Sequence, residues 1–291
     1  MKILTLIENT SADDKLIPEH GVSFFIERRG RRFLFDTGAS DRFMKNAARM
    51  KTELTLDAVI LSHNQAENAG GIESVLKKYP SVTVYARQGV KGDFFLQESV
   101  FQVPIGIPKA VFDRRRENFV LFNKFQEVSK GIYLLSNEVF DEEYEAPGGK
   151  NYYARYAGES DSGQKKRLTR ADFRDELFMA VFPTAKTEGG CVVIMPCAHA
   201  GVVNMLRTVR LCWPNVPILG VIAGFHFMGN SQKQLLCSPE YIDAVAEELA
   251  KMELGQIYAC HCTGGRGYDR LKLHLGDQIQ YLRTGEELVF N

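Results

Sequence analysis

The amino-acid sequence predicts a layered α/β protein, and two observations support this. Short apolar runs of strand length, such as DAVILS at 57–62, alternate along the chain with segments of helical spacing. The 291 residues are 45% hydrophobic and 25% charged, which is typical of a globular protein with a substantial buried core. A prior of about 150 residues per domain suggests two domains, although α/β proteins of this size often fold as one.

The N-terminal part of the chain begins with strands. The turn ERRGRR joins two β-prone runs into a predicted hairpin, and the runs after it alternate between strand and helix. The run at 57–62 is almost continuously apolar, as expected of a strand that is buried on both faces. In chain order we predict strands over 2–8, 22–28 and 32–36, a helix over 41–50, a strand over 57–62, a helix over 71–78 and a strand over 82–87.

The C-terminal part returns to the same alternation after a less regular middle. Residues 88–130 mix proline, glycine and charges, and 137–175 form a long polar segment with several tyrosines. A loop of that length is uncommon inside a compact domain, so we expect an insertion that covers a site or forms an interface. Further along we predict strands over 177–182, 190–196, 218–223, 256–260, 278–282 and 287–290, with helices over 201–212, 241–252 and 266–275.

Composition excludes several classes of protein. The 36 basic and 36 acidic residues leave no formal net charge, which argues against a nucleic-acid or anionic-membrane partner and favours a small-molecule ligand. The longest apolar stretches, around 192–206 and 216–228, are too short and too polar to span a membrane. All six cysteines lie between 191 and 262, a poor disulfide framework for this length, so we expect a cytoplasmic protein.

Four of the six histidines share one setting. His63, His199, His226 and His261 each stand at or just past the end of an apolar run. Strand ends of an α/β sheet meet at one edge, so these side chains should converge there. Each one alone is readily explained as a partly buried structural histidine. Together they indicate a metal site, because neutral imidazole is the commonest protein ligand for metals.

The segment around His63 reads LSHNQAENAGGI (61–72) and resembles the H-x-H-x-D-H block of the metallo-β-lactamase superfamily. Blocks at 19–38, 196–206, 223–229 and 260–264 resemble those of hydrolases grouped with the ribofuranosylaminobenzene-phosphate (dihydropterin) synthase branch, in the same order. The resemblance implies one domain over 1–291, a four-layer αββα sandwich with an insertion at about 137–175. It places the site where the two sheets meet.

The block departs from the family pattern at the metal ligands. Its four key positions read His63, Gln65, Glu67 and Asn68, so two histidines are replaced by amides that suit zinc poorly. A complete dinuclear zinc centre is therefore not expected. The resemblance still supplies His63, His199 and His261 as ligands of one divalent transition metal, whether zinc, manganese or iron. The sequence is equally compatible with no metal at all.

The resemblance also suggests roles around that centre. Glu67 would be a ligand or a general base, and His226 would orient the substrate or donate to the transition state. Gly264 and Arg266 begin a helix whose free N–H groups could cradle a phosphate, which fits a small, phosphorylated metabolite. Asp36 would support the site loops. The residues expected to line the pocket are His20, Asp36, Gln65, Asn68, Gly264 and Arg266.

Two functions remain open at this level. The first is a metal-dependent hydrolase with altered ligands and a reduced, mononuclear site. The second is a non-catalytic descendant that binds a small molecule, in which the Gln65 and Asn68 amides form hydrogen bonds. Cys197, Cys260 and Cys262 flank the histidines, but small buried hydrophobic residues are the preferred interpretation for them. The tyrosines of 137–175 would either cap the pocket or form a homo-oligomer contact.

Overall fold

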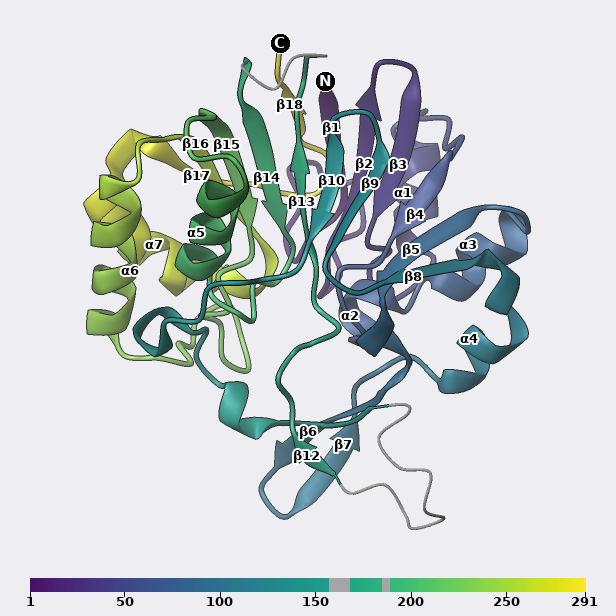
Figure 1. Ribbon diagram of the computed structural model, residues 1–291, viewed down its shortest axis with the longest axis horizontal. Coiled ribbons are helices and arrows are strands. Elements are labelled where there is room, and N and C mark those ends of the chain that lie inside the picture. The colour runs from purple at the N-terminus through teal and green to yellow at the C-terminus, as the bar shows by residue number, and fades with distance from the viewer. Residues whose placement is uncertain (157–167, 185–188) are drawn as a thin grey trace.

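The computed structural model describes residues 1–156, 168–184 and 189–291, apart from the side chain of Lys150. Within these residues, two seven-stranded sheets pack face to face between two layers of helices (Figure 1). This is the predicted αββα sandwich. The two termini lie close together at one end of the molecule, and a small third sheet lies at the opposite end.

The first sheet has the order β18-β1-β2-β3-β4-β5-β8. Its strands β1 to β3 are antiparallel, and β3, β4, β5 and β8 are parallel. Apolar side chains of α1, α3 and α4 cover its outer face. The strands are β1 (Lys2–Ile7), β2 (Ser23–Arg28), β3 (Arg31–Phe35), β4 (Ala58–Ile60), β5 (Thr83–Arg87), β8 (Phe119–Phe122) and β18 (Glu287–Val289), and the helices are α1 (Arg42–Arg49), α3 (Ile72–Lys78) and α4 (Lys109–Arg114).

The second sheet has the order β17-β16-β15-β14-β13-β10-β9, and its strands β14 to β17 are parallel. Helices α5, α6 and α7 cover its outer face (Figure 1). The strands are β9 (Phe125–Ser129), β10 (Ile132–Leu135), β13 (Phe178–Val181), β14 (Cys191–Met195), β15 (Ile218–Ala223), β16 (Leu254–Ala259) and β17 (Ile279–Tyr281), and the helices are α5 (Val202–Cys212), α6 (Pro239–Lys251) and α7 (Gly264–Leu275).

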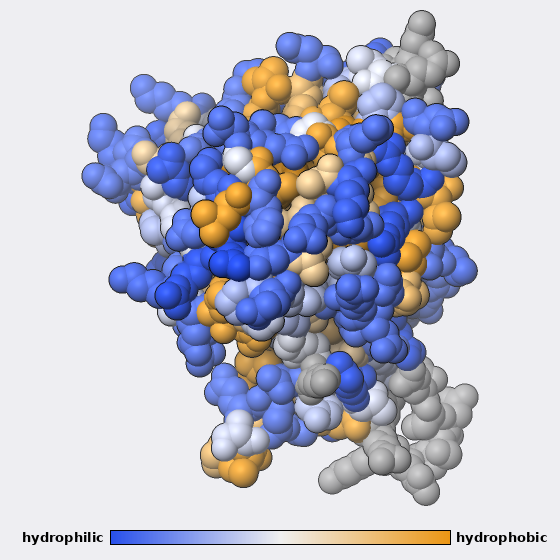
Figure 2. Space-filling view, turned by 90° about the vertical axis from the view of Figure 1, so that its left-hand side faces the viewer, coloured by the Kyte–Doolittle hydropathy of each residue, from blue (hydrophilic) through white to orange (hydrophobic). Residues whose placement is uncertain are grey.

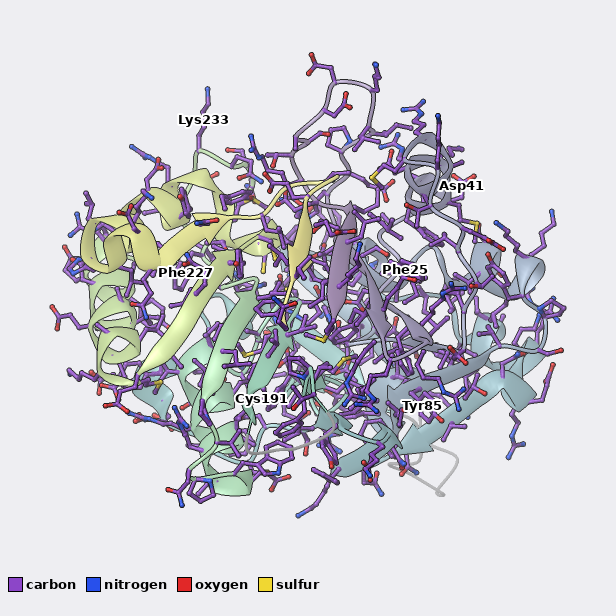
Figure 3. The ribbon with its side chains drawn as sticks, turned by 90° about the horizontal axis from the view of Figure 1, so that it is seen from above. Phe25, Asp41, Tyr85, Cys191, Phe227 and Lys233 are labelled. Carbon is purple, nitrogen blue, oxygen red and sulfur yellow. The ribbon has the colours of Figure 1, made fainter. Side chains whose placement is uncertain are left out.

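The space between the sheets is filled by side chains from both inner faces. Phe24 and Phe33 of the first sheet and Met179 and Ile194 of the second are among its buried residues. Burial of one such side chain is worth about 1.5–3 kcal/mol, so this layer is a main source of stability. Figure 3, which looks down on the sandwich, shows the first sheet around Phe25 and the second sheet around Cys191 side by side, with the helices outside them.

Outside 88–175, each predicted helix and strand is present within two residues of its expected ends. Helix α6 illustrates why local signals suffice. Ser238 accepts a hydrogen bond from the Tyr241 N–H at its start, Pro239 occupies the first turn, and Ile242 and Val245 are among its buried residues. These are the cap and the periodicity by which a helix can be recognised in sequence.

The polar segment 137–175 is not a structureless loop where the structure describes it. Its strands β11 (Tyr152–Arg155) and β12 (Thr169–Arg170) form a third sheet with the hairpin β6 (Asp93–Glu98) and β7 (Phe101–Pro104), in the order β12-β11-β6-β7. Residues 157–167 of the predicted insertion lie outside the described residues. The third sheet has its own small core, which includes Phe94, Ala154 and Phe173. Strand β11 pairs with a hairpin that is distant in sequence, so local patterns do not predict it.

The side of the molecule that carries α6 and α7 is largely hydrophilic, with isolated apolar residues (Figure 2). Among the residues that the structure describes, no helix combines the length and the apolar character needed to cross a bilayer.

Candidate metal centre and substrate cavity

The structure brings together the histidines that follow parallel strands. His63 follows β4, His199 follows β14, His226 follows β15 and His261 follows β16, and all four are buried. The ring centroids of His63 and His199 are 4.9 Å apart, and those of His199 and His226 are 4.4 Å apart. The sheet edge therefore gathers imidazoles from both sheets, as the strand-end pattern predicts.

Side-chain atoms that could bind a metal form two groups. The first contains His63, Cys197 and His199, and the second contains Cys197, His261 and Cys262. Within each group the candidate ligand atoms all lie within 4.8 Å of one another. His261 thus groups with the two cysteines rather than with the other two predicted ligands, and Cys197 belongs to both groups.

Three buried ring nitrogens lack a hydrogen-bond partner. The Nε2 atoms of His63, His199 and His261 have no hydrogen-bond partner in the structure. The Nδ1 atom of His63 is already engaged by Ser62 Oγ at 2.7 Å, and that of His261 by Asn9 Oδ1 at 3.0 Å. Metal-binding histidines are held in this way, with one ring nitrogen on a protein group and the other on the ion. The residues present therefore fit a metal ion.

The electrostatics of His63 and His199 favour ligation. Burial lowers the pKa of His63 to about 4. Burial and the neighbouring His226 hold the pKa of His199 well below its usual value. Both imidazoles are therefore neutral at physiological pH, and a neutral ring nitrogen has the lone pair that a metal needs.

Glu67, on the short helix α2 (Ala66–Ala69), lies between two histidines. Its Oε2 atom is 3.4 Å from His20 Nε2, and its Oε1 atom is 3.4 Å from His261 Nε2. Burial opposes its ionisation, but His20 and His261 hold the pKa of Glu67 well below its usual value. Burial likewise opposes a charge on His261, but Cys262 and Glu67 raise the pKa of His261 to about 9. A carboxylate of low pKa suits the role of ligand or countercharge better than that of general base.

Cys197 and Cys262 are buried, as the sequence interpretation expects, and they also belong to the groups of candidate metal ligands. Cys197 Sγ lies 3.3 Å from Cys262 Sγ and 3.4 Å from His226 Nδ1. Their positions beside His199 and His261 in the chain are the signal that could have found them. Cys260 instead packs in the apolar core between the sheets, as predicted.

Buried carboxyl groups hold the backbone of the loops that carry the histidines. Asp36 accepts hydrogen bonds from Ser62 N at 2.7 Å, Ser62 Oγ at 2.6 Å and Asn68 Nδ2 at 2.8 Å. It therefore fixes the loop after β4 on both sides of His63. This is the supporting role that the family resemblance implies for Asp36.

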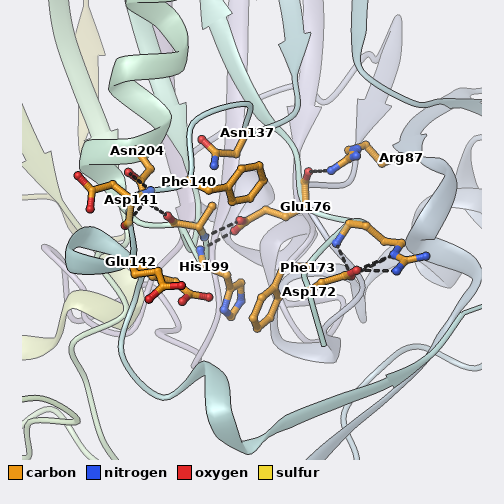
Figure 4. Close-up of a pocket in the computed structure, with 13 residues that line it drawn as sticks. Arg87, Asn137, Phe140, Asp141, Glu142, Asp172, Phe173, Glu176, His199 and Asn204 are labelled. Atoms are coloured by element: carbon orange, nitrogen blue, oxygen red, sulfur yellow. Dashed lines mark hydrogen bonds and ion pairs between the residues drawn. The ribbon is translucent and has the colours of Figure 1, made fainter. Parts of the chain in front are cut away.

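Three further carboxyl groups act in the same way and were not found from the sequence. Glu176 accepts from His199 N at 2.7 Å and Ala200 N at 3.0 Å, contacts that Figure 4 shows. Asp175 accepts from Asn64 N at 2.8 Å, and Glu8 accepts from His261 N at 2.7 Å. Each acid directly precedes or follows an apolar strand, and that placement is the signal in the sequence.

The protonation of these groups predicts a pH dependence of stability. Burial raises the pKa of Glu176 to about 8 and that of Asp36 to about 7, and His261 titrates at about 9. Between pH 6.5 and 8 the folded protein therefore binds more protons than the unfolded chain. Stability of the metal-free protein should fall as pH rises, by up to about 1.4 kcal/mol per pH unit for each titrating group.

Urea unfolding of the metal-free protein at several pH values measures this slope. The variant Glu176→Gln cannot titrate, so its unfolding free energy should fall less steeply over the same range. The depressed pKa values of His63 and His199 act in the opposite sense near pH 6.5, because the unfolded chain binds protons there that the folded protein does not, but this contribution is the same in both proteins. Equal slopes for the two proteins would contradict a protonated Glu176.

A cavity of about 960 Å³ lies beside the centre. Tyr152 of β11 is part of its wall, and the Tyr152 hydroxyl is 3.4 Å from His226 Nε2. The polar segment thus covers the site, as one of the two predicted roles requires. The other residues of the wall include predicted site residues and many amides and hydroxyls: Asn9, His20, Glu67, Gln97, Ser99, Asn151, His226, Asn230, Ser231, Gln232 and Cys262.

A second cavity, of about 380 Å³, is lined by His199 and Glu176 (Figure 4). Phe173 stacks on His199 there, with ring centroids 4.1 Å apart and planes inclined by 8°. This stacking fixes the plane of the His199 ring. Figure 4 also shows Asp172 bound by a neighbouring arginine at the edge of this cavity.

The predicted pocket residues fall into two sets. His20 lines the large cavity, and Gln65 and Asn68 are buried below it. Gly264 packs against Met228, and Arg266 is exposed at the start of α7. The expected phosphate cradle is corrected by the structure, because Gln232 already accepts the N–H groups of Gly265 and Arg266, at 2.8 and 3.3 Å.

Comparisons with known proteins agree with the fold. No family model matches the chain. The 7,8-dihydropterin-6-methyl-4-(β-D-ribofuranosyl)-aminobenzene-5′-phosphate synthase of Methanocaldococcus jannaschii is 24% identical over 302 residues, which cover 100% of this chain and 97% of the relative. A metal-dependent hydrolase of the β-lactamase superfamily has a similar structure, with a TM-score of 0.78 and 24% identity over 100% of this chain and 99% of the other. A diphosphatase of the PhnP family aligns with a TM-score of 0.55 and 14% identity over 100% and 98%.

Proposed function

We propose that this chain, which has the metallo-β-lactamase fold, is a metal-dependent hydrolase that works with one transition-metal ion. The observation that carries the proposal is the pair of buried Nε2 atoms on His63 and His199, which have no hydrogen-bond partner and belong to one group of candidate ligands with Cys197. A buried nitrogen without a partner costs about 1–3 kcal/mol, and a bound ion would remove that cost.

His63, His199 and Cys197 would hold the ion. His261 and Cys262 form the other group of candidate ligands, which also contains Cys197. A thiolate in the donor set favours zinc or iron over manganese. We propose one ion rather than two because Gln65 and Asn68 replace two family histidines. The Asn68 amide is also committed to Asp36, to which it donates at 2.8 Å.

When bound, the ion would lower the pKa of water towards about 7 and polarise the bond under attack. Around it, Tyr152 and His226 are placed to orient a substrate that enters the large cavity. Burial raises the pKa of Tyr152, so its hydroxyl stays protonated and can donate a hydrogen bond. Glu67 contributes a negative charge beside His261. The amide and hydroxyl groups of the cavity wall suit a small polar metabolite, and a phosphorylated one remains within the proposal.

Metal content tests this function directly. Protein purified without chelators or a metal-affinity tag should carry about one equivalent of metal after incubation with zinc, manganese or iron. The variant His199→Ala should lose most of it, because it removes one of the two imidazole ligands proposed for the ion. The matched control is His274→Ala, since His274 lies on α7 and binds Asp243 instead. Well under one equivalent in the unaltered protein, or equal loss in both variants, would contradict the proposal.

One observation favours the second candidate, a protein that binds a small molecule without catalysis. The Asn68 Oδ1 atom is buried and has no partner, so it could accept a hydrogen bond from a ligand. A screen of phosphoesters and thioesters separates the two functions. Metal-dependent turnover that disappears in His199→Ala would exclude the non-catalytic candidate.

A further inference from the structure

We propose that Cys197 and Cys262 are a reversible oxidation site, and that their disulfide removes the sulfur donors from the metal centre. The two sulfur atoms lie 3.3 Å apart and are therefore already in contact. They belong to loops that follow β14 and β16, which are 65 residues apart in sequence. The fold itself brings them together, so the pair does not depend on a chance meeting of mobile side chains.

The pair is distinguished from the other cysteines by its surroundings. All six cysteines lie in the described part of the chain, and Cys197 and Cys262 are the pair whose sulfur atoms are reported in contact. Cys191 and Cys260 are enclosed in two separate apolar cores. Cys212 is exposed on α5, and no sulfur contact is seen for it.

Cys262 is accessible to a small oxidant although it is buried, because it lines the cavity of about 960 Å³. Both sulfur atoms lie beside imidazole rings. His226 Nδ1 is 3.4 Å from Cys197 Sγ, and His261 adjoins Cys262 in the chain and in its ligand group. The thiolate is the form of cysteine that reacts with peroxides.

The reaction balances with hydrogen peroxide as the oxidant. The Cys262 thiolate attacks one peroxide oxygen, the O–O bond breaks, and a sulfenic acid and one water form. The Cys197 sulfur then attacks the sulfenic sulfur, the S–O bond breaks, and a second water leaves. Two thiols and one peroxide thus become one disulfide and two waters. A dithiol reductant reverses the change by thiol–disulfide exchange.

The consequence for the metal rests on the proposed function. Cys197 is shared by both groups of candidate ligands, and a disulfide sulfur is no longer a thiolate donor. Oxidation should therefore lower zinc stoichiometry at least fivefold, and reduction should restore it. Conversely, bound zinc should protect both thiols from peroxide.

The test uses the full chain in its metal-free form. After treatment with hydrogen peroxide, free thiols counted in denaturant should fall from six per chain to four, and the intact mass should fall by two hydrogen atoms. Peptide mapping should find the segments around Cys197 and Cys262 cross-linked. Cys262→Ser should lose this cross-link, whereas the matched control Cys191→Ser should retain it. The map of the unaltered protein decides the question even if a variant does not fold.

The outcomes separate this inference from the proposed function. A cross-link between other cysteines, or oxidation that leaves Cys197 and Cys262 unlinked while the reduced protein binds zinc, overturns the oxidation site alone. A correct cross-link in a protein that binds no metal when reduced overturns the metal centre and leaves the oxidation site standing. A correct cross-link with unchanged zinc content overturns the loss of sulfur donors.

Discussion

Replacing Glu176 by alanine is expected to lower the free energy of unfolding by about 4 kcal/mol, because two buried N–H groups lose their acceptor. The Glu176 carboxyl group accepts from the backbone of His199 and Ala200 and is itself buried. No other acceptor is seen for the His199 N–H in the described structure. The His199 ring would also lose its fixed backbone, so metal affinity should fall about 10–100-fold.

Urea unfolding of the metal-free protein, followed by zinc titration, measures both effects. Glu176→Gln keeps one acceptor oxygen and should lose roughly half as much stability. The matched control is Glu138→Ala, because Glu138 is a partly exposed glutamate whose side chain binds Ser136. A loss below about 1 kcal/mol in Glu176→Ala would mean that the carboxyl group does not hold this loop.

The double variant Gln65→His with Asn68→His is expected to raise metal content from about one equivalent to about two. It restores the two imidazoles that the family pattern has and this chain lacks, and neutral imidazole binds transition metals far better than an amide oxygen does. The geometry allows the exchange at Asn68, since an imidazole N–H can replace the amide that donates to Asp36. The remaining ring nitrogen would then be available to an ion.

Elemental analysis of the purified double variant, after incubation with zinc, checks this prediction. Each single variant should gain less than the pair, because a second site needs both donors. Gln97→His is the matched control, since Gln97 lines the large cavity on β6, away from the loop after β4. An unchanged stoichiometry in the double variant would show that the positions 63–68 do not correspond to the family's metal-binding block.

Much of the architecture could be predicted from the sequence, because its signals are local. Buried parallel strands such as 218–223 are continuous apolar runs. Helix α6 is predicted by its cap residue Ser238, by Pro239 in its first turn and by the helical spacing of its apolar residues. The third sheet could not be predicted in this way. Strand β11 is short, and its partners β6 and β12 both lie outside its own stretch of sequence, so local patterns do not predict it.

Some features of the candidate site could likewise be predicted from the sequence, and others could not. The strand-end positions of His63, His199, His226 and His261 can be read directly, and so can the loss of two histidines at Gln65 and Asn68. The resemblance also implies the supporting role of Asp36, but the roles of Glu8, Asp175 and Glu176 were not predicted, because an acid beside a strand is usually solvated and holds a loop only when that loop packs over it. The Gly264 turn shows the reverse case, since its pattern suggests an anion site that Gln232 already occupies.

By itself, then, the order of residues determined the layered fold and the edge at which imidazoles gather, since each depends on residue type and short-range spacing, and the incomplete metal-binding block followed from the resemblance of 61–72 to a known family. Only the tertiary structure decided that Cys197 joins two groups of ligands and touches Cys262. The physical reason is that a thiol is an inert apolar group or a reactive donor according to its neighbours. Those neighbours come from loops that are far apart along the chain and meet only when both sheets have formed.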